Sequence, residues 1–174
     1  MTKNKPKKPN KNQLLNYLKG VGVKFKILAH KVVYTAHDEA ETQKKKLAEV
    51  AKTVLVKVDK GLALVIVPAS KYVDLKAIKK ALSAKGGSAS GGKAAKVEMA
   101  KEADITKRLK SKIGLLHPFG NLYKISTLLD KALTKSKKII TSAGSYTESI
   151  EIAVKDFEKL VQPIKGVFSK SKRR

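Results

Sequence analysis

The chain has 174 residues, a length typical of one domain, and 42% of them are hydrophobic, which is enough for a packed core. It carries 39 Lys and Arg against 14 Asp and Glu, a formal charge of +25, and it has no cysteine. These numbers exclude thiol nucleophiles, disulfides and thiolate metal sites, and they predict attraction to polyanions.

The positive charge is almost entirely lysine, since arginine occurs only at Arg108, Arg173 and Arg174. Few bidentate guanidinium contacts are therefore available, so we expect contacts with nucleic-acid phosphates rather than base-specific duplex recognition. A second interpretation stays open: the lysines reflect a compositional bias of the source, as in a high-salt, high-temperature or AT-rich genome.

Metal and membrane sites are not expected. The histidines are His30, His37 and His117, and no two of them have the spacing of a helical or finger zinc site. The longest apolar stretch, Leu62 to Val67, is too short for a bilayer span, and the first residues lack the apolar region of a secretory signal. We therefore expect a soluble, cytoplasmic protein without a cofactor.

The secondary structure follows from periodicity and from turn residues. Thr35 with Asp38 three residues later has the spacing of a helix cap, and Asp74 precedes an apolar stripe of Leu75, Ile78 and Leu82. The expected helices are 11–20, 35–50, one after Asp74, 102–110 and 154–162. The expected strands are 23–29, 51–59, 62–68, 97–100, 122–129, 138–142 and 148–153.

Strands 51–59 and 62–68 form a predicted hairpin around Asp59-Lys60-Gly61, with Gly61 expected to supply the positive φ of the turn. Residues 62–67 do not alternate in polarity, so this strand is expected to be covered on both faces. Paired strands mixed with single helices predict an α/β (α+β) domain with a mixed, largely antiparallel central sheet.

We expect one folded domain, residues 11–168. A basic arm at 1–10 precedes it and a basic tail at 169–174 follows it. Within the domain, the Gly/Ser-rich segment 84–96 reads as a flexible loop.

Lys52 opens the strand 51–59 and shares a face with Val54, Val56 and Val58, whereas Lys57 points to the other face. An ammonium at the rim of an apolar face costs desolvation unless an anionic or polar group meets it, which makes Lys52 a candidate site residue. The alternative is that Lys52 only extends past the end of the strand to water.

Three turns are candidates to surround Lys52. Gly114 to Gly120 is a tight Gly/Pro bend in which Phe119 is expected to wall a pocket. Ala143 to Thr147 is a small-residue turn with N–H groups for a substrate oxygen. Val33 to Thr35 lies at a helix start that favours an anion. Each turn taken singly is common, so their value lies in the combination.

That combination resembles the YbaK/ProX family, the aminoacyl-tRNA deacylases related to the editing domain of bacterial prolyl-tRNA synthetases. The resemblance runs in order over about 11–168, and its most specific parts are the lysine-headed strand and the Gly-x-x-x-Pro-Phe-Gly loop. The matching segments are His30 with Val33 to Thr35, Ala51 to Val56, Val67 to Ala69, Val73 to Lys76, Gly114 with Pro118 to Gly120, Ala143 to Ser145 and Ser149 to Ile152.

The resemblance implies hydrolysis of the ester between a wrong amino acid and the 3′ end of a tRNA, with tRNA for proline carrying Ala, Cys or another small amino acid as the expected substrate. It implies Lys52 as the catalytic residue and tRNA as the partner; participation of an aminoacyl-tRNA synthetase stays open. The substrate-binding residues it implies are Tyr34, Thr35, Gly114, His117, Pro118, Phe119, Gly120, Gly144, Ser145 and Tyr146.

Two positions depart from the family pattern. Tyr146 stands where several relatives have histidine, so it is expected to narrow the pocket or change which amino acid fits. His117 stands where relatives often have a small residue, and we expect it on the loop surface.

Two other functions remain as alternatives. One is a non-catalytic tRNA- or RNA-binding module with the same fold, and the other is a protein-interaction domain on a translation complex.

Overall fold

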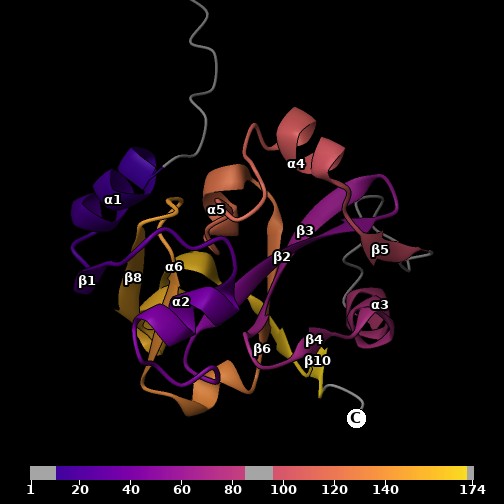
Figure 1. Cartoon of the computed structure of the whole chain (residues 1–174). Helices are drawn as coiled ribbons and strands as arrows, with labels where there is room; N and C mark the ends of the chain where they lie inside the picture. The colour runs from indigo at the N-terminus through magenta and orange to yellow at the C-terminus, as the bar shows by residue number, and fades with distance from the viewer. Residues whose placement is uncertain (1–10, 85–95, 172–174) are drawn as a thin grey trace, which may run out of the picture.

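The computed structural model describes residues 11–84 and 96–171 (Figure 1). Its helices are α1 Lys11–Gly20, α2 Ala36–Thr42, α3 Leu75–Ala84, α4 Glu102–Arg108, α5 Gly120–Tyr123 and α6 Val154–Val161, with a short 3-10 turn at Leu133–Lys135. Its strands are β1 Phe25–Ala29, β2 Ala51–Val58, β3 Gly61–Pro68, β4 Tyr72–Val73, β5 Val97–Met99, β6 Ser126–Asp130, β7 Lys138–Ser142, β8 Glu148–Ala153, β9 Ile164–Gly166 and β10 Ser169–Lys170. None of the helices in these described ranges is long and apolar enough to cross a membrane.

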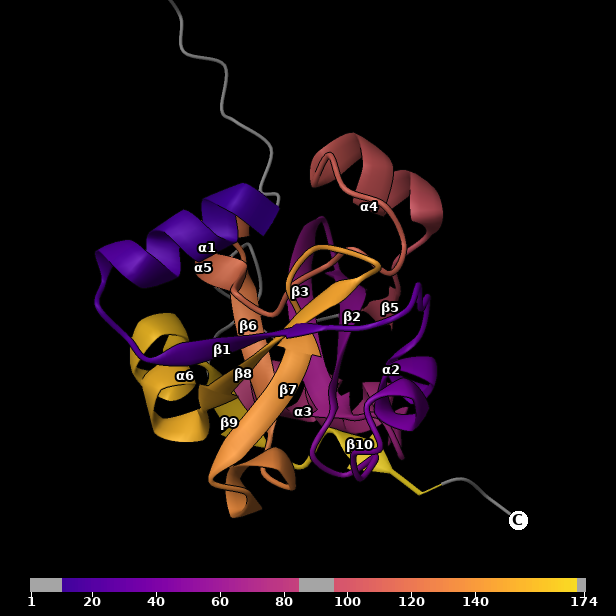
Figure 2. The ribbon, with the colours of Figure 1, turned by 60° about the vertical axis from the view of Figure 1, so that its left-hand side comes forward.

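The strands form a mixed, mostly antiparallel arrangement, so the predicted fold class is confirmed. The largest sheet has the order β5-β2-β3-β6-β9, in which β6 runs parallel to both β3 and β9. A second, antiparallel sheet has the order β1-β8-β7, and β4 pairs with β10. A bridge between Val50 and Ile140 joins the start of β2 to β7. Figure 2 shows β1, β8 and β7 crossing in front of the β2–β3 hairpin.

The β2–β3 hairpin is the framework of the fold, and Lys52 pairs with Val67 at its open end. Its two-residue turn consists of Asp59 and Lys60, and the positive φ of 51° belongs to Asp59. The expectation that Gly61 supplies the positive φ is therefore wrong: Gly61 already pairs with Val58 as a strand residue. Aspartate is one of the few residues other than glycine that tolerate this conformation. Its carboxylate also accepts a hydrogen bond from the Lys96 N–H at 2.9 Å, which ties the turn to a distant part of the chain.

The predicted double coverage of β3 is confirmed, because Ala63 to Val67 are all buried. Alternate residues of the strand enter two different cores. Leu64 and Ile66 pack with α1 and α6, and Val65 and Val67 pack with Ile78 of α3. The hairpin is thus held from both sides, which makes it a rigid base for any group at its open end.

Helix α2 begins as predicted but ends earlier. The Thr35 hydroxyl caps it by accepting from the Asp38 N–H at 3.1 Å. The expected continuation to residue 50 is wrong, because the helix ends at Thr42 and Lys44 has a φ of 51°. The Lys45 N–H then donates to the Ala40 carbonyl at 2.9 Å, a bond that closes the helix end as in a Schellman motif.

The last strands were not predicted. β9 adds to the edge of β6, and β10 pairs with β4 through Ser169 and Val73. The first two residues of the expected 169–174 tail therefore belong to the folded domain, and Ser169 is buried. The expected arm at 1–10 and most of the expected loop at 84–96 lie outside the described residues.

Candidate active site

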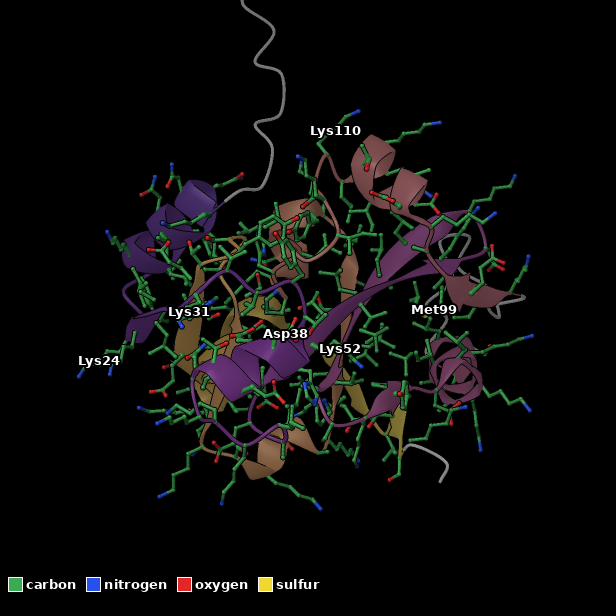
Figure 3. The ribbon with its side chains drawn as sticks, in the orientation of Figure 1. Lys24, Lys31, Asp38, Lys52, Met99 and Lys110 are labelled. Atoms are coloured by element: carbon green, nitrogen blue, oxygen red, sulfur yellow. The ribbon has the colours of Figure 1, made fainter. Side chains whose placement is uncertain are left out.

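Lys52 lies at the open end of the hairpin, and its amine does not extend freely into water. The Nζ atom donates a hydrogen bond to the Lys71 carbonyl at 2.8 Å and lies 5.5 Å from the centre of the Tyr72 ring. Lys71 is placed by the turn that follows β3, in which its N–H donates to the Pro68 carbonyl at 3.0 Å. The side chain is half-buried, and burial lowers the pKa of the Lys52 ammonium from its ordinary value. Figure 3 shows Lys52 beside α2, whereas Lys24 and Lys110 project from the edge of the molecule.

A cavity of about 320 Å³ lies beside Lys52. It opens there because, in the described part of the chain, β5 pairs only with residues Val56 to Val58 of β2, which leaves the first half of this edge uncovered. The wall is largely apolar; its apolar members are Val33, Ala36, Ala51, Val54, Leu55, Met99, Ala100, Ile105, Ile113 and Leu116. The other members are His30, Tyr34, Thr35, Glu39, Lys52, Thr53, Gly114, Ser142, Ser145 and Ser149. A ligand bound here would bury an apolar group next to a few fixed polar atoms.

The three predicted turns meet at this cavity. The Val33 N–H donates to the Tyr146 carbonyl at 2.9 Å, which joins the turn Val33 to Thr35 to the turn Ala143 to Thr147. The Tyr146 hydroxyl donates to the Ile113 carbonyl at 2.9 Å, and the rings of Tyr34 and Tyr146 lie 5.1 Å apart. Segments that are distant in the sequence are therefore joined by direct bonds at the rim.

The close contact between these segments requires glycine at position 114. Its φ is +80°, and a Cβ atom there would lie 3.0 Å from the Tyr146 ring and 3.1 Å from the Tyr34 carbonyl oxygen. Both the conformation and the close approach exclude a larger residue without strain. Tyr146 thus connects the segments at the rim.

The turn Ala143 to Thr147 offers fewer free donors than expected. The Gly144 N–H donates to the Ser142 hydroxyl at 3.1 Å, and the Thr147 N–H donates to the Ser145 hydroxyl at 3.2 Å. Among the hydrogen bonds of residues 11–84 and 96–171, none uses the Ser145 or Tyr146 N–H. These two N–H groups are the donors of this turn without a partner among the described residues, and of the two only Ser145 belongs to a residue that lines the cavity.

A polar chain in the wall of the cavity was missed by the sequence analysis. The His30 Nε2 atom lies 2.8 Å from the Ser149 hydroxyl, and its Nδ1 atom lies 2.7 Å from the Lys31 carbonyl oxygen. Ser149 also lies near the carboxyl of Glu39, which is only 5% exposed. His30 and Ser149 are separated by 119 residues, so no local sequence signal could have revealed this contact.

Burial raises the pKa of the Glu39 carboxyl, while Ser149, His30 and Gln43 act in the opposite direction. Glu39 lies in the first turn of α2 and lines the cavity. The prediction of an anion site at this helix start is wrong, because Asp38 and Glu39 stand in that turn and the Asp38 N–H is already capped by Thr35.

Six of the predicted substrate-binding residues do not line the cavity: His117, Pro118, Phe119, Gly120, Gly144 and Tyr146. Phe119 is fully buried in the core, where its ring meets the edge of Phe157 at 5.3 Å, so it does not wall the pocket. Gly120 begins α5 at a point where a Cβ atom would overlap the Thr127 hydroxyl oxygen.

His117 is fully buried, so its expected position on the loop surface is wrong. Its ring stacks on Tyr123 at 4.5 Å, and its Nδ1 atom accepts from the Phe119 N–H at 3.4 Å. Burial lowers the pKa of His117 to about 3, so the imidazole is neutral near neutral pH. The stacking and the local hydrogen bond explain why a histidine is tolerated inside this loop.

Within the described ranges, no group of three or more His, Asp or Glu side chains could hold a metal ion. The polar groups in or beside the cavity are a half-buried ammonium, main-chain donors, hydroxyls, an imidazole and a carboxyl.

The fold and the site can be compared with known proteins. The family model of the aminoacyl-tRNA editing domain matches residues 30–160, which include every residue that lines the cavity. The chain therefore belongs to the aminoacyl-tRNA editing domain family, and the resemblance drawn from the sequence is confirmed.

Two solved structures share the fold. One is described as "hypothetical protein APE2540"; it is 18% identical, with a TM-score of 0.77 over 90% of this chain and 99% of that one. The other is described as "a putative trans-editing enzyme for prolyl tRNA synthetase"; it is 16% identical, with a TM-score of 0.77 over 94% of this chain and 98% of that one. At these identities the similarity concerns the fold alone.

Proposed function

We propose that the protein is a trans-editing hydrolase that removes a wrongly attached amino acid from the 3′ end of a tRNA, with tRNA for proline charged with a small amino acid as its substrate. The observation that carries the proposal is the fixed amine of Lys52 at a largely apolar cavity bordered by three joined turns. Membership of the aminoacyl-tRNA editing domain family supports the reaction class.

The reaction needs little beyond positioning and charge stabilisation, because an aminoacyl ester is already activated. Water attacks the ester carbonyl carbon, the bond from that carbon to the ribose oxygen breaks, and a proton from the water passes to the departing ribose oxygen. The free amino acid and an uncharged tRNA result. An ammonium and main-chain donors that hold the developing oxyanion account for the rate enhancement.

Lys52 is suited to that role. Its ammonium has three donors, and one of them is used by the Lys71 carbonyl. The other two are left for the ester carbonyl or for a ribose hydroxyl. Because the Lys71 bond already fixes the amine, little reorganisation is needed when the substrate binds.

We expect a small amino acid because the resemblance to the editing family implies one. The cavity of about 320 Å³ has Val54, Leu55 and Ile113 in its lining, so an apolar aminoacyl side chain such as that of Ala or Cys would meet apolar groups there.

The alternative function is a tRNA-binding module without catalysis. It also agrees with the formal charge of +25, because phosphate attraction does not need a working cavity. The two functions are separated by a deacylation panel in which tRNA for proline carries Ala, Cys, Ser or Pro. The hydrolase hypothesis expects release of at least one small amino acid and protection of the prolyl ester; no release from any of them favours the binding module.

A further inference from the structure

The cavity contains two oppositely charged types of side chain. Among its described lining residues, Glu39 carries the carboxyl and Lys52 the amine. Glu39 is only 5% exposed, so its negative charge is poorly solvated by water. The proposed mechanism uses Lys52 but assigns no role to Glu39.

The hydrogen bonds around Glu39 show that its carboxylate has few hydrogen-bond donors. A carbonyl oxygen only accepts, so the His30 Nδ1 atom, 2.7 Å from the Lys31 carbonyl, must carry a hydrogen. In a neutral imidazole the Nε2 atom is then an acceptor, and the Ser149 hydroxyl donates to it at 2.8 Å. A hydroxyl has one hydrogen, so Ser149 cannot also donate to the Glu39 carboxylate in that state.

When the Ser149 hydrogen goes to His30, Gln43 remains the described side-chain donor to Glu39, across a long 3.4 Å. A buried carboxylate normally accepts several hydrogen bonds, and an anion with so few donors favours a cationic ligand. The raised pKa of the Glu39 carboxyl agrees with this shortage of charge compensation.

We propose that Glu39, held beside Ser149 and Gln43, binds the α-ammonium group of the aminoacyl ester. This inference rests on the proposed function. The α-ammonium is the cation that every aminoacyl ester carries next to its carbonyl, and it provides three donors. Lys52 would then hold the ester or ribose oxygens while Glu39 holds the amine. The cavity would recognise an amino acid as such and reject esters in which the amine is blocked or absent.

The test compares three esters on the same tRNA: alanyl, N-acetylalanyl and lactyl, the last with a hydroxyl in place of the amine. Each enzymatic rate is divided by the spontaneous hydrolysis rate of the same ester, because the ammonium itself activates the ester. Without the charge-assisted bond to Glu39, kcat/KM for the lactyl and N-acetylalanyl esters should be about 10- to 100-fold below that for the alanyl ester.

The matched variants are Glu39→Gln and Glu41→Gln. Glu41 lies on the same helix, with an exposed side chain that pairs with His37. Glu39→Gln should lower kcat/KM for the alanyl ester by about 10-fold or more and leave the lactyl ester nearly unchanged, so the discrimination between them disappears. Glu41→Gln should keep wild-type discrimination.

The outcomes separate this inference from the proposed function. If wild-type protein hydrolyses no aminoacyl ester, the proposed function fails and the inference fails with it. If it hydrolyses the alanyl and lactyl esters equally well after normalisation, or if Glu39→Gln keeps the discrimination, the ammonium subsite is overturned while the hydrolase function stands. Should Glu39→Gln fail to fold, the comparison of alanyl and lactyl esters on wild-type protein still decides.

Discussion

Lys52 donates a hydrogen bond to the carbonyl oxygen of Lys71 at 2.8 Å, and this bond fixes a charged amine at the mouth of the cavity. The two residues are brought together by the hairpin, since Lys52 pairs with Val67 and the turn after β3 returns Lys71 to the same place. The position of the amine is therefore built by strand pairing and does not depend on a flexible loop.

Replacement of Gly114 by alanine should weaken the rim of the cavity. The φ of +80° and the two close approaches predict a decrease of about 1–3 kcal/mol in the free energy of unfolding, together with a lower kcat/KM. Gly20→Ala is the matched control, because a Cβ atom there meets nothing within 4 Å; its effect on stability should stay within about 0.5 kcal/mol. Denaturant unfolding of both variants measures the difference, and equal stabilities would contradict the account of Gly114.

Tyr34 is expected to stack on the unpaired terminal base of the tRNA. Its side chain is 66% exposed at the rim, and its ring is supported by Tyr146. Stacking of one base is worth about 1–3 kcal/mol, so Tyr34→Ala should raise KM roughly 10-fold, whereas Tyr34→Phe should stay near wild type. The check is steady-state deacylation on intact tRNA and on tRNA with an abasic 3′ end; an equal rise in KM on both substrates would rule out stacking.

His117 should make the fold sensitive to mild acid. The unfolded chain protonates this residue below its ordinary pKa of 6.5, whereas burial keeps it neutral in the folded state down to about pH 3. Its contribution to stability is therefore complete above pH 6.5 and falls by about 1.4 kcal/mol per unit as the pH drops from 6.5 towards 3.

The comparison for this prediction is His117→Asn, which keeps an acceptor near the Phe119 N–H but does not titrate. Urea unfolding between pH 6.5 and 5 should give a smaller slope of stability against pH for the variant than for the wild type. Parallel slopes would show that another group causes the acid sensitivity.

The two basic ends should contribute affinity for tRNA without affecting chemistry. The sequence places Lys3, Lys5, Lys7 and Lys8 in the first ten residues and ends on Lys172-Arg173-Arg174. Because Ser169 and Lys170 form β10, the truncation that leaves the folded domain intact removes 1–10 and 171–174. It should raise KM, leave kcat nearly unchanged, and flatten the salt dependence by about 0.7–0.9 for each phosphate that the ends no longer neutralise. An unchanged salt slope would show that the two ends do not contribute to tRNA binding.

Local signals explain why much of the fold could be predicted from the sequence. The apolar face of α1, the caps at Thr35 and Asp74, and the apolar run of β3 each require only neighbouring residues. Strands β7 and β8 alternate or cluster apolar residues in the same local way. For these elements the periodicity agrees with the burial found in the structure.

The missed features depend on tertiary partners. At the end of α2 the positive-φ position is occupied by Lys44 rather than by the usual glycine, so the sequence has no signal for the helix end there. The first residues of the predicted strand 122–129 belong to α5 instead, which forms where Gly120 fits against Thr127. β9 and β10 are too short to have a pattern of their own, and they exist because β6 and β4 offer free edges.

The site was predicted in part for the same reason. Lys52, Tyr34, Thr35, Gly114 and Ser145 line the cavity as expected, because strand and turn positions are readable from the chain. The His30–Ser149–Glu39 contacts join distant segments and could not be read in this way.

In the proposed mechanism the Lys52 amine stabilises the oxyanion that forms when water attacks the ester. The decisive experiment is deacylation of alanyl-tRNA for proline by wild type, Lys52→Ala and Lys57→Ala, with tRNA affinity measured alongside. Lys57 is on the same strand but on its other face. We expect Lys52→Ala to lower kcat by at least about 100-fold with tRNA affinity almost unchanged, and Lys57→Ala to retain activity. Hydrolysis by Lys52→Ala at the wild-type rate would show that Lys52 has no such role.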